Sequence, residues 1–305
     1  MRKVIGIGET IMDIVFKNEQ PTKAVPGGSV FNGLISLGRA GIETTFISEV
    51  GNDRVGNTIL NFMKENGVNG HHVCVYPDSK SPVSLAFLND KNDAEYIFYK
   101  DYPKLSLDVE LPEINSDDVV IFGSFYAISP LIRNKVKELL DKARQAGAII
   151  YYDVNFRSTH KTDAIKLLPT ILENFEYADI IRGSGEDFEN MFGMTGADKI
   201  YKGKVAFYCP RFICTNGGEA ISLRTTSLTK DYNVEPMQTV STIGAGDSFN
   251  AGLIYGILKN RIRRADLDEL TESDWDKIIA SGMTFSREVC ASLDNYVSKE
   301  FAGKL

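Results

Sequence analysis

Short runs of apolar, β-prone residues recur along the chain, and they constrain its fold more than any other feature. The runs are almost uniformly apolar instead of alternating with polar residues, which is typical of strands that are covered on both faces. They are Val4–Gly8, Thr44–Val50, Val119–Gly123, Ala148–Asp153, Asp179–Ile181 and Phe212–Thr215. We therefore expect a mostly parallel sheet with helices on both of its faces.

Helical patterns lie between these runs. Ser129 and Pro130 have the form of a helix cap followed by proline at the first helical position. Apolar residues then recur at helical spacing up to Gly147, which should end the helix. Strands that alternate with helices in this way predict a doubly wound α/β fold. With 305 residues, the chain should form one large domain with a small appendage.

Two stretches differ from this pattern. Residues 11–25 and 83–100 alternate between polar and apolar residues, as half-exposed strands do, and residues 89–93 form a turn-like segment. We expect a small antiparallel sheet that stands off the main domain. From these features alone, the sheet is either a surface hairpin or a lid.

Composition excludes several classes of protein. The net charge of −7 argues against nucleic-acid binding, which needs a concentrated basic face. No apolar run reaches the ~18 residues of a membrane span, and Glu9 and Asp13 interrupt the apolar N-terminus, so a signal peptide is not predicted. The four cysteines form no C-x-x-C pair, so we expect reduced thiols, no zinc site and a cytoplasmic protein.

The run Gly-Ala-Gly-Asp at residues 244–247 is the strongest chemical signal. Its small residues would let backbone N–H groups converge at the start of a helix, where the helix dipole favours an anion. Asp247, in the first turn, could then accept a hydroxyl proton during phosphoryl transfer. Local features leave open an aspartate that only serves the helix N-terminus.

Two further segments combine glycine or polar residues with the start of a helix or the end of a strand. Gly27 and Gly28 precede Asn32, which should lie one turn into a helix. Residues 153–157, Asp-Val-Asn-Phe-Arg, follow a buried strand, where ligands of open α/β sheets bind. No Walker A pattern exists, and Gly6 and Gly8 lack the third glycine of a dinucleotide site.

These three segments occur in the order found in the PfkB, or ribokinase-like, family of carbohydrate kinases, and the chain resembles that family over essentially its whole length. The resemblance implies a single domain over residues 1–305, a ribokinase-like three-layer α/β/α sandwich with a mostly parallel central sheet and a small β-sheet lid. It implies an ATP-dependent kinase for a small-molecule sugar, with the lid at about residues 11–25 and 83–100. It also implies a homodimer formed through the lid.

The resemblance assigns roles to individual residues. The catalytic set would be the base Asp247, the anion hole of Gly244, Ala245 and Gly246, and Arg157. The sugar would be bound by Asp13, Gly27, Gly28, Asn32, Asp153 and Asn155. The nucleotide would be bound by Ser184, Thr215, Gly217 and Gly218.

The chain departs from the family pattern at two places. Ser241 replaces an aspartate that helps to bind a monovalent cation in many members, which leaves activation by potassium open. The N-x-x-E segment of the family is Ser184-Gly-Glu-Asp187 here, so Glu186 and Asp187 are expected to help hold magnesium through water. Most of the Mg²⁺ ligands should be ATP phosphates and water.

The sequence favours fructose as the sugar. The segment Gly-Gly-Ser-Val-Phe-Asn at residues 27–32 and the segment at residues 96–100 resemble fructokinases. Kinases for 2-keto-3-deoxygluconate, ribose or a nucleoside are the alternatives within the family. A non-catalytic sugar-binding regulator is the alternative from another class, and a nicotinamide-dependent enzyme is weaker still.

Overall fold

The computed structural model describes residues 2–89, 94–101 and 107–305, and it divides into two compact units. The first unit comprises Met1–Glu113 and Gln238–Leu305, and the second comprises Ile114–Met237. In the first unit β4 pairs in parallel with β1 on one side and β5 on the other. The strands are β1 (Val4–Ile7), β4 (Thr44–Gly51) and β5 (Val68–Tyr76). β1 and β4 are buried along their whole length, as their apolar sequences predict.

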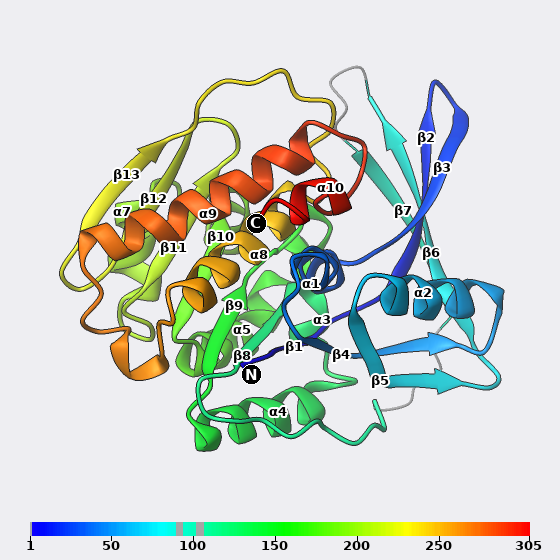
Figure 1. The fold of residues 1–305 in the computed structure, drawn as a ribbon, viewed down its shortest axis with the longest axis horizontal. Coiled ribbons are helices and arrows are strands. Elements are labelled where there is room, and N and C mark those ends of the chain that lie inside the picture. Colours follow the sequence, from blue (N-terminus) through cyan, green and yellow to red (C-terminus); the bar gives the residue numbers. More distant parts are fainter. Residues whose placement is uncertain (1, 90–93, 102–106) are drawn as a thin grey trace. The chain divides into compact units, whose positions relative to one another are not determined.

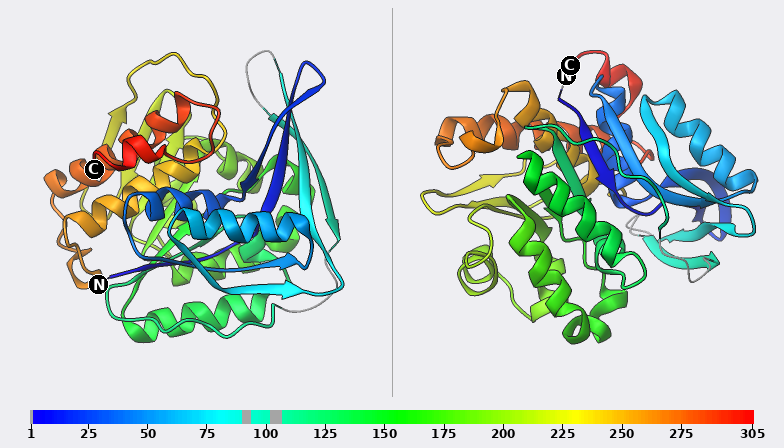
Figure 2. Two further views of the ribbon diagram at one scale, coloured as in Figure 1. Left: turned by 45° about the vertical axis from the view of Figure 1, so that its right-hand side comes forward. Right: turned by 90° about the horizontal axis from the view of Figure 1, so that it is seen from below.

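The first unit also contains a separate four-stranded sheet in the order β3-β2-β6-β7, which stands apart from β1, β4 and β5 in Figures 1 and 2. Its strands are β2 (Ile11–Lys17), β3 (Gln20–Gly27), β6 (Lys80–Leu88) and β7 (Ala94–Asp101). The sheet was expected to be antiparallel, but its central pair, β2 and β6, is parallel. The predicted turn at residues 89–93 lies, apart from Asn89, outside the described residues.

Helices of the first unit come from both ends of the chain. They are α1 (Ser29–Arg39), α2 (Arg54–Glu65), α8 (Ala245–Lys259), the short η3 (Arg264–Asp266), α9 (Glu272–Cys290) and α10 (Lys299–Ala302). Helix α1 packs against α8, where the Ser36 and Ser248 hydroxyls lie 3.4 Å apart in the buried interface. Helices α8 and α9 pack along each other (Figure 1).

In the second unit β8, β9, β10 and β11 run parallel, and β12 and β13 continue the sheet antiparallel. The strands are β8 (Val119–Gly123), β9 (Ile149–Asp153), β10 (Ile180–Ser184), β11 (Phe212–Asn216), β12 (Ala220–Arg224) and β13 (Thr229–Asn233). Because parallel strands place their carboxyl ends at one edge, Asp153, Ser184 and Thr215 come to the same edge.

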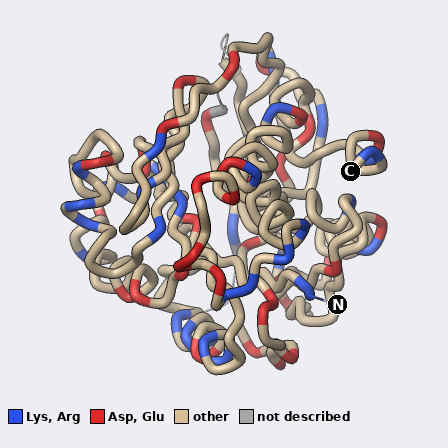
Figure 3. The backbone as a smooth tube through the Cα atoms, turned by 60° about the vertical axis from the view of Figure 1, so that its left-hand side comes forward, with Lys and Arg blue, Asp and Glu red and all other residues tan. Residues whose placement is uncertain are grey.

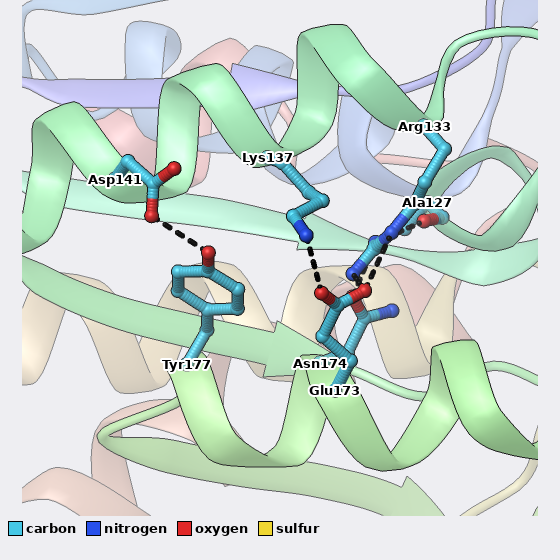
Figure 4. Close-up of polar contacts among 7 residues, drawn as sticks. All are labelled: Ala127, Arg133, Lys137, Asp141, Glu173, Asn174 and Tyr177. Atoms are coloured by element: carbon cyan, nitrogen blue, oxygen red, sulfur yellow. Dashed lines mark hydrogen bonds and ion pairs between the residues drawn. The ribbon is translucent and has the colours of Figure 1, made fainter.

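The helices of the second unit are joined by polar side chains as well as by apolar packing. They are α3 (Ser124–Ile128), α4 (Arg133–Ala146), η1 (Ser158–Asp163), α5 (Ala164–Tyr177), α6 (Gly185–Phe192), α7 (Ala197–Ile200) and η2 (Tyr201–Val205). Figure 4 shows α4 bound to α5. Glu173 accepts from Arg133 and Lys137, each at 2.6 Å, and Tyr177 donates to Asp141 at 2.6 Å.

The predicted start of the helix before Gly147 is wrong. Ser129 ends α3 instead, a single turn joins the Ile132 amide to the Ser129 carbonyl, and α4 begins at Arg133. A Ser-Pro pair starts a turn as readily as a helix, which explains the error. The predicted end is confirmed, because Gly147 adopts the left-handed conformation with φ 77°. Strands β5, β12 and β13 were not predicted.

Basic and acidic residues are interspersed along the backbone in Figure 3, in keeping with a chain of modest net charge, −7. Among the described residues, no helix has the length and apolar character needed to cross a membrane.

Candidate active site

Asp13 is a buried carboxylate in the middle of the four-stranded sheet. It lies on β2, where its backbone pairs with Val25 of β3 and Ser84 of β6. The side chain of Ser84 donates a hydrogen bond to Oδ1 of Asp13. Only 7% of Asp13 is exposed, which is rare for a carboxylate.

The surroundings of Asp13 favour its protonated form. Burial raises its pKa from the usual 3.8 to about 6, against the hydrogen bond from Ser84, which lowers it. The negative charges of Glu9 and Asp247 raise the pKa further. At neutral pH the Asp13 carboxylate is therefore charged, and the hydrogen bond from Ser84 offsets only part of the cost of burying that charge.

Gly27, at the end of β3, leaves room for this carboxylate. A Cβ atom at Gly27 would lie 2.3 Å from Oδ2 of Asp13, well inside the contact distance. Gly28 follows with φ 130°, and its own Cβ would lie 2.2 Å from the Glu9 carbonyl oxygen. Only glycine fits at either position, so the predicted glycine pair is required by Asp13 and by the entry into α1.

Asn32 and Asp247 meet although they lie 215 positions apart in the chain. Nδ2 of Asn32, in α1, donates to Oδ2 of Asp247, in the first turn of α8, at 2.8 Å. Oδ1 of Asn32 is buried and has no hydrogen-bond partner among the residues that the structure describes. An unpaired buried acceptor is costly. Its presence here fits a ligand whose hydroxyl group donates a hydrogen bond to it.

The glycine-rich run begins helix α8, as predicted. Gly244 caps the helix with φ 76°, and a Cβ there would lie 2.2 Å from the carbonyl oxygen of Asn295. The backbone of Ala245 and Gly246 forms the first turn, where amide groups point out of the helix end. This end favours an anion beside the Asp247 carboxylate.

Ser241 lies just before this run and is buried. Its hydroxyl accepts a hydrogen bond from the Ile243 amide at 3.2 Å, so it fixes the turn that leads into α8. A hydroxyl brings no charge to this position, where the family pattern has a carboxylate.

In the second unit, Asp153 and Thr215 are linked by a residue that sequence reasoning missed. Arg182, on β10, donates from Nη1 to Asp153 Oδ1 at 3.1 Å and from Nη2 to Thr215 Oγ1 at 2.6 Å. The available signal was an arginine inside an otherwise apolar strand, since a buried charge in such a run needs partners.

Asn155 and Arg157 follow β9. Asn155 has φ 38°, an uncommon backbone for a residue other than glycine, and such backbone strain tends to gather at functional sites. Arg157 is exposed and precedes η1.

Ser184 and Asp187 form a capping box at the start of α6. The Ser184 hydroxyl accepts from the Asp187 amide at 3.1 Å, and the Asp187 carboxylate accepts from the Ser184 amide at 2.7 Å. Burial raises the pKa of Asp187. Glu186 is exposed. Within residues 2–89, 94–101 and 107–305, no three His, Cys, Asp or Glu side chains are arranged to hold a metal ion.

The turn between β11 and β12 contains Gly217 and Gly218. Gly217 has φ 52°, and the turn closes with a hydrogen bond from the Glu219 amide to the Asn216 carbonyl at 3.0 Å. A side chain at Gly218 would meet nothing within 4 Å, so the turn borders open space in this unit.

The substitution Asp13→Asn should stabilise the protein at neutral pH. Between pH ~4 and ~6 the native state binds more protons at Asp13 than the unfolded chain, so wild-type stability falls as pH rises. Asparagine removes the buried charge. We expect its free energy of unfolding to exceed that of wild type by about 3 kcal/mol at pH ~7.5, a gain that vanishes near pH 4.

Urea unfolding at several pH values measures this difference. Asp53→Asn is the control with the opposite sign, because backbone and Ser81 hydrogen bonds outweigh burial and hold the pKa of Asp53 low. That variant should lose stability at neutral pH. An Asp13→Asn protein less stable than wild type at pH ~7.5 would contradict the account of Asp13.

Comparison with known proteins places the chain in a family. Residues 1–291 match the family model that is described as "pfkB family carbohydrate kinase". The chain is 31% identical over 249 residues to a 5-dehydro-2-deoxygluconokinase of Geobacillus kaustophilus (strain HTA426), covering 77% of this chain and 73% of the relative. It is 25% identical over 288 residues to a probable chloroplastic fructokinase-6 of Arabidopsis thaliana, covering 88% and 74%.

Solved structures agree on the fold. An aminoimidazole riboside kinase from Salmonella enterica, complexed with aminoimidazole riboside and an ATP analogue, matches with a TM-score of 0.84 at 22% identity over 99% of this chain and 98% of that one. A fructokinase double mutant from Vibrio cholerae O395, bound to fructose, ADP and a potassium ion, also scores 0.84, at 16% identity over 97% and 94%.

These matches confirm the ribokinase-like α/β fold, with its mostly parallel sheet and small β-sheet lid. The family model, described as that of carbohydrate kinases, spans nearly the whole chain. The chain therefore belongs to the pfkB family of carbohydrate kinases and is an ATP-dependent sugar kinase.

Proposed function

We propose that this enzyme is a fructokinase, which transfers the terminal phosphoryl group of ATP to a hydroxyl group of fructose. The observation that carries the proposal is the 2.8 Å hydrogen bond that joins Asn32 to Asp247 at the N-terminus of α8. This bond supports the proposal because it holds Asn32, a proposed sugar ligand, against a carboxylate at a helix end that favours anions.

Asp13 and Asn32 supply acceptors for sugar hydroxyl groups. The Asp13 carboxylate already accepts from Ser84 through Oδ1, and its Oδ2 faces the space left by Gly27. Oδ1 of Asn32 is a second buried acceptor. Hydroxyl groups are donors that both can use, and the bare backbone of Gly27 and Gly28 would let a sugar ring approach.

Asp247 acts as the general base. It accepts the proton of the attacking hydroxyl as the sugar oxygen bonds to the terminal phosphorus of ATP and the bond from that phosphorus to ADP breaks. The Asn32 amide orients the carboxylate. Amide groups of Gly244, Ala245 and Gly246 stabilise the charge on the transferred phosphoryl group.

Residues of the second unit have proposed roles of their own. Asp153, Asn155 and Arg157 serve the acceptor and the transferred phosphate. The nucleotide is bound by Ser184, Thr215, Gly217 and Gly218. The strained backbone at Asn155 and the open turn at Gly218 support these roles, because both are features of ligand-binding segments.

A magnesium ion is proposed to accompany ATP. The described residues offer no ready-made cage for a metal, and Asp187 is engaged with Ser184. Its ligands would be mainly phosphate oxygens and water, with the exposed Glu186 acting through water, as suits an ion that dehydrates reluctantly. When bound, the ion would neutralise phosphate charge.

Fructose is favoured by the segment at residues 27–32 and by fructokinase relatives such as that of Rhizobium leguminosarum bv. trifolii, which is 28% identical over 283 residues. A keto-deoxy sugar substrate is the second candidate. It is favoured by the 31% identity to a 5-dehydro-2-deoxygluconokinase and by the exposed Arg157, which could pair with an acidic group.

Two lesser expectations remain predictions. We propose that the lid sheet joins two copies of the chain, because its edge strand β7 exposes large apolar side chains, with Ile97, Phe98 and Tyr99 between 45% and 59% exposed. A cytoplasmic location also remains a prediction.

The substitution Gly27→Ala should weaken binding of the sugar. Its methyl group would displace the Asp13 carboxylate, 2.3 Å away. We expect the KM for fructose to rise by roughly tenfold or more, equivalent to ~1.4 kcal/mol, with little change in the KM for ATP.

Gly41→Ala is the matched control. The kinetics of both variants are measured in a coupled assay of ADP release. Gly41 has φ 76° and no atoms within 4 Å of an added Cβ, so alanine there should cost about 1 kcal/mol of stability through backbone strain alone. Its KM for fructose should match wild type. Equal KM values for the two variants would sink the proposed link between Gly27 and the sugar.

The substitution Asp247→Asn should lower kcat by roughly 10²–10⁴, the usual contribution of a positioned general base, while ATP affinity changes little. Asparagine can still hydrogen-bond to Asn32 but cannot accept the proton. Steady-state kinetics and binding of an ATP analogue measure both quantities. Near-normal turnover would show that Asp247 serves only the helix end.

A panel of acceptors tests the proposed activity itself. Coupled ADP release should be fastest with fructose among hexoses, ribose, nucleosides and keto-deoxy sugar acids. Preference for a keto-deoxy sugar acid would favour the second candidate. The absence of turnover with every acceptor would overturn the catalytic proposal and favour a sugar-binding regulator.

A further inference from the structure

Arg182 lies at the centre of three neighbouring parallel strands. Its backbone on β10 pairs with Asp153 on β9 and with Ile213 on β11. Its side chain is buried, and one guanidinium group reaches sideways in both directions, to Asp153 at 3.1 Å and to Thr215 at 2.6 Å. A single planar group therefore connects the carboxyl ends of β9 and β11.

Both partners of Arg182 begin segments with proposed ligand roles. Asp153 begins residues 153–157, assigned above to the acceptor and the transferred phosphate. Thr215 begins the turn assigned to the nucleotide, and its backbone pairs with Ser184, which has the same assignment. The bridge thus joins an acceptor segment to a nucleotide segment.

The link that Arg182 makes between Asp153 and Thr215 is buried and charged. Burial acts to lower the pKa of Arg182, but the Asp153 carboxylate and the nearby Asp187 outweigh it, so the pKa is raised and the guanidinium stays charged. A fixed fork of donors can serve Asp153 and Thr215 at the same time, whereas a lysine ammonium is a point charge on a flexible stem.

We propose that Arg182 is a positioning residue that couples the binding of sugar and nucleotide. The inference rests on the proposed roles of Asp153 and Thr215. A ligand that orders Asp153 restricts the motion of the Arg182 guanidinium and, through it, the motion of Thr215. The second substrate then binds more tightly, because the turn that begins at Thr215 is already ordered. The coupling must be equal in both directions, because binding free energies are linked.

Arg224 provides a matched control within the same unit. It is also buried, lies on β12 and pairs with two carboxylates, Asp198 at 2.5 Å and Asp231 at 2.8 Å. However, its carboxylate partners Asp198 and Asp231 have no proposed ligand role. Arg224→Lys thus disturbs a second buried arginine of the same sheet without touching the link between Asp153 and Thr215.

The test measures the Kd of a non-hydrolysable ATP analogue by calorimetry, with and without saturating fructose, or the best acceptor of the panel. In the wild type, the Kd without the sugar should be about fivefold or more higher than the Kd with the sugar. Arg182→Lys should reduce this ratio to near one, and Arg224→Lys should leave it unchanged. Thermal unfolding of each variant checks that it is folded.

Thr215→Val keeps the proposal falsifiable if Arg182→Lys does not fold. It removes only the hydroxyl that accepts from Arg182, and it should also reduce the ratio to near one. A ratio near one in wild type, or an unchanged ratio in a folded Arg182→Lys or Thr215→Val protein, would overturn the coupling. Those outcomes would not bear on the proposed function, whereas the absence of turnover by the wild type with every acceptor would overturn the proposed function as well.

Discussion

The hydrogen bond from the Asn32 amide to the Asp247 carboxylate is the contact on which the proposed chemistry depends. It joins the first turns of α1 and α8, which come from opposite ends of the chain. The two helices can meet only because they pack along each other, with Ser36 and Ser248 in contact below. A carboxylate held by one oxygen at a helix N-terminus is oriented before any ligand arrives, which is what a general base requires.

Several features around this contact are unfavourable for the stability of the fold. Asp13 is buried, and its pKa is raised to about 6 as a result. Oδ1 of Asn32 lacks a partner among the described residues. Gly27 and Gly28 cannot be replaced without a clash. Such costs gather where a ligand would relieve them, since a hydroxyl can donate to both acceptors.

The second unit solves a similar problem in a different way. Two of its buried carboxylates, Asp153 and Asp187, are engaged by protein groups, the first by Arg182 and the second by the Ser184 amide. Under the proposed assignment, Asp13 and Asn32 in the first unit offer acceptors to the sugar. In the second unit the bonds of Asp153 and Asp187 also stiffen the strand ends and the start of α6, next to segments that are proposed to bind ligands.

The sequence by itself determined the strands with uniformly apolar runs and the residue types of the candidate site. Such runs are typical of strands covered on both faces, so β1, β4 and β8–β11 could be predicted, and glycines with an aspartate at a helix start suited phosphoryl transfer. Only the tertiary structure decided which of these residues meet. The Asn32–Asp247 contact, the reason for Gly27 and the role of Arg182 depend on packing and strand register, which bring distant residues together and leave no local pattern in the sequence.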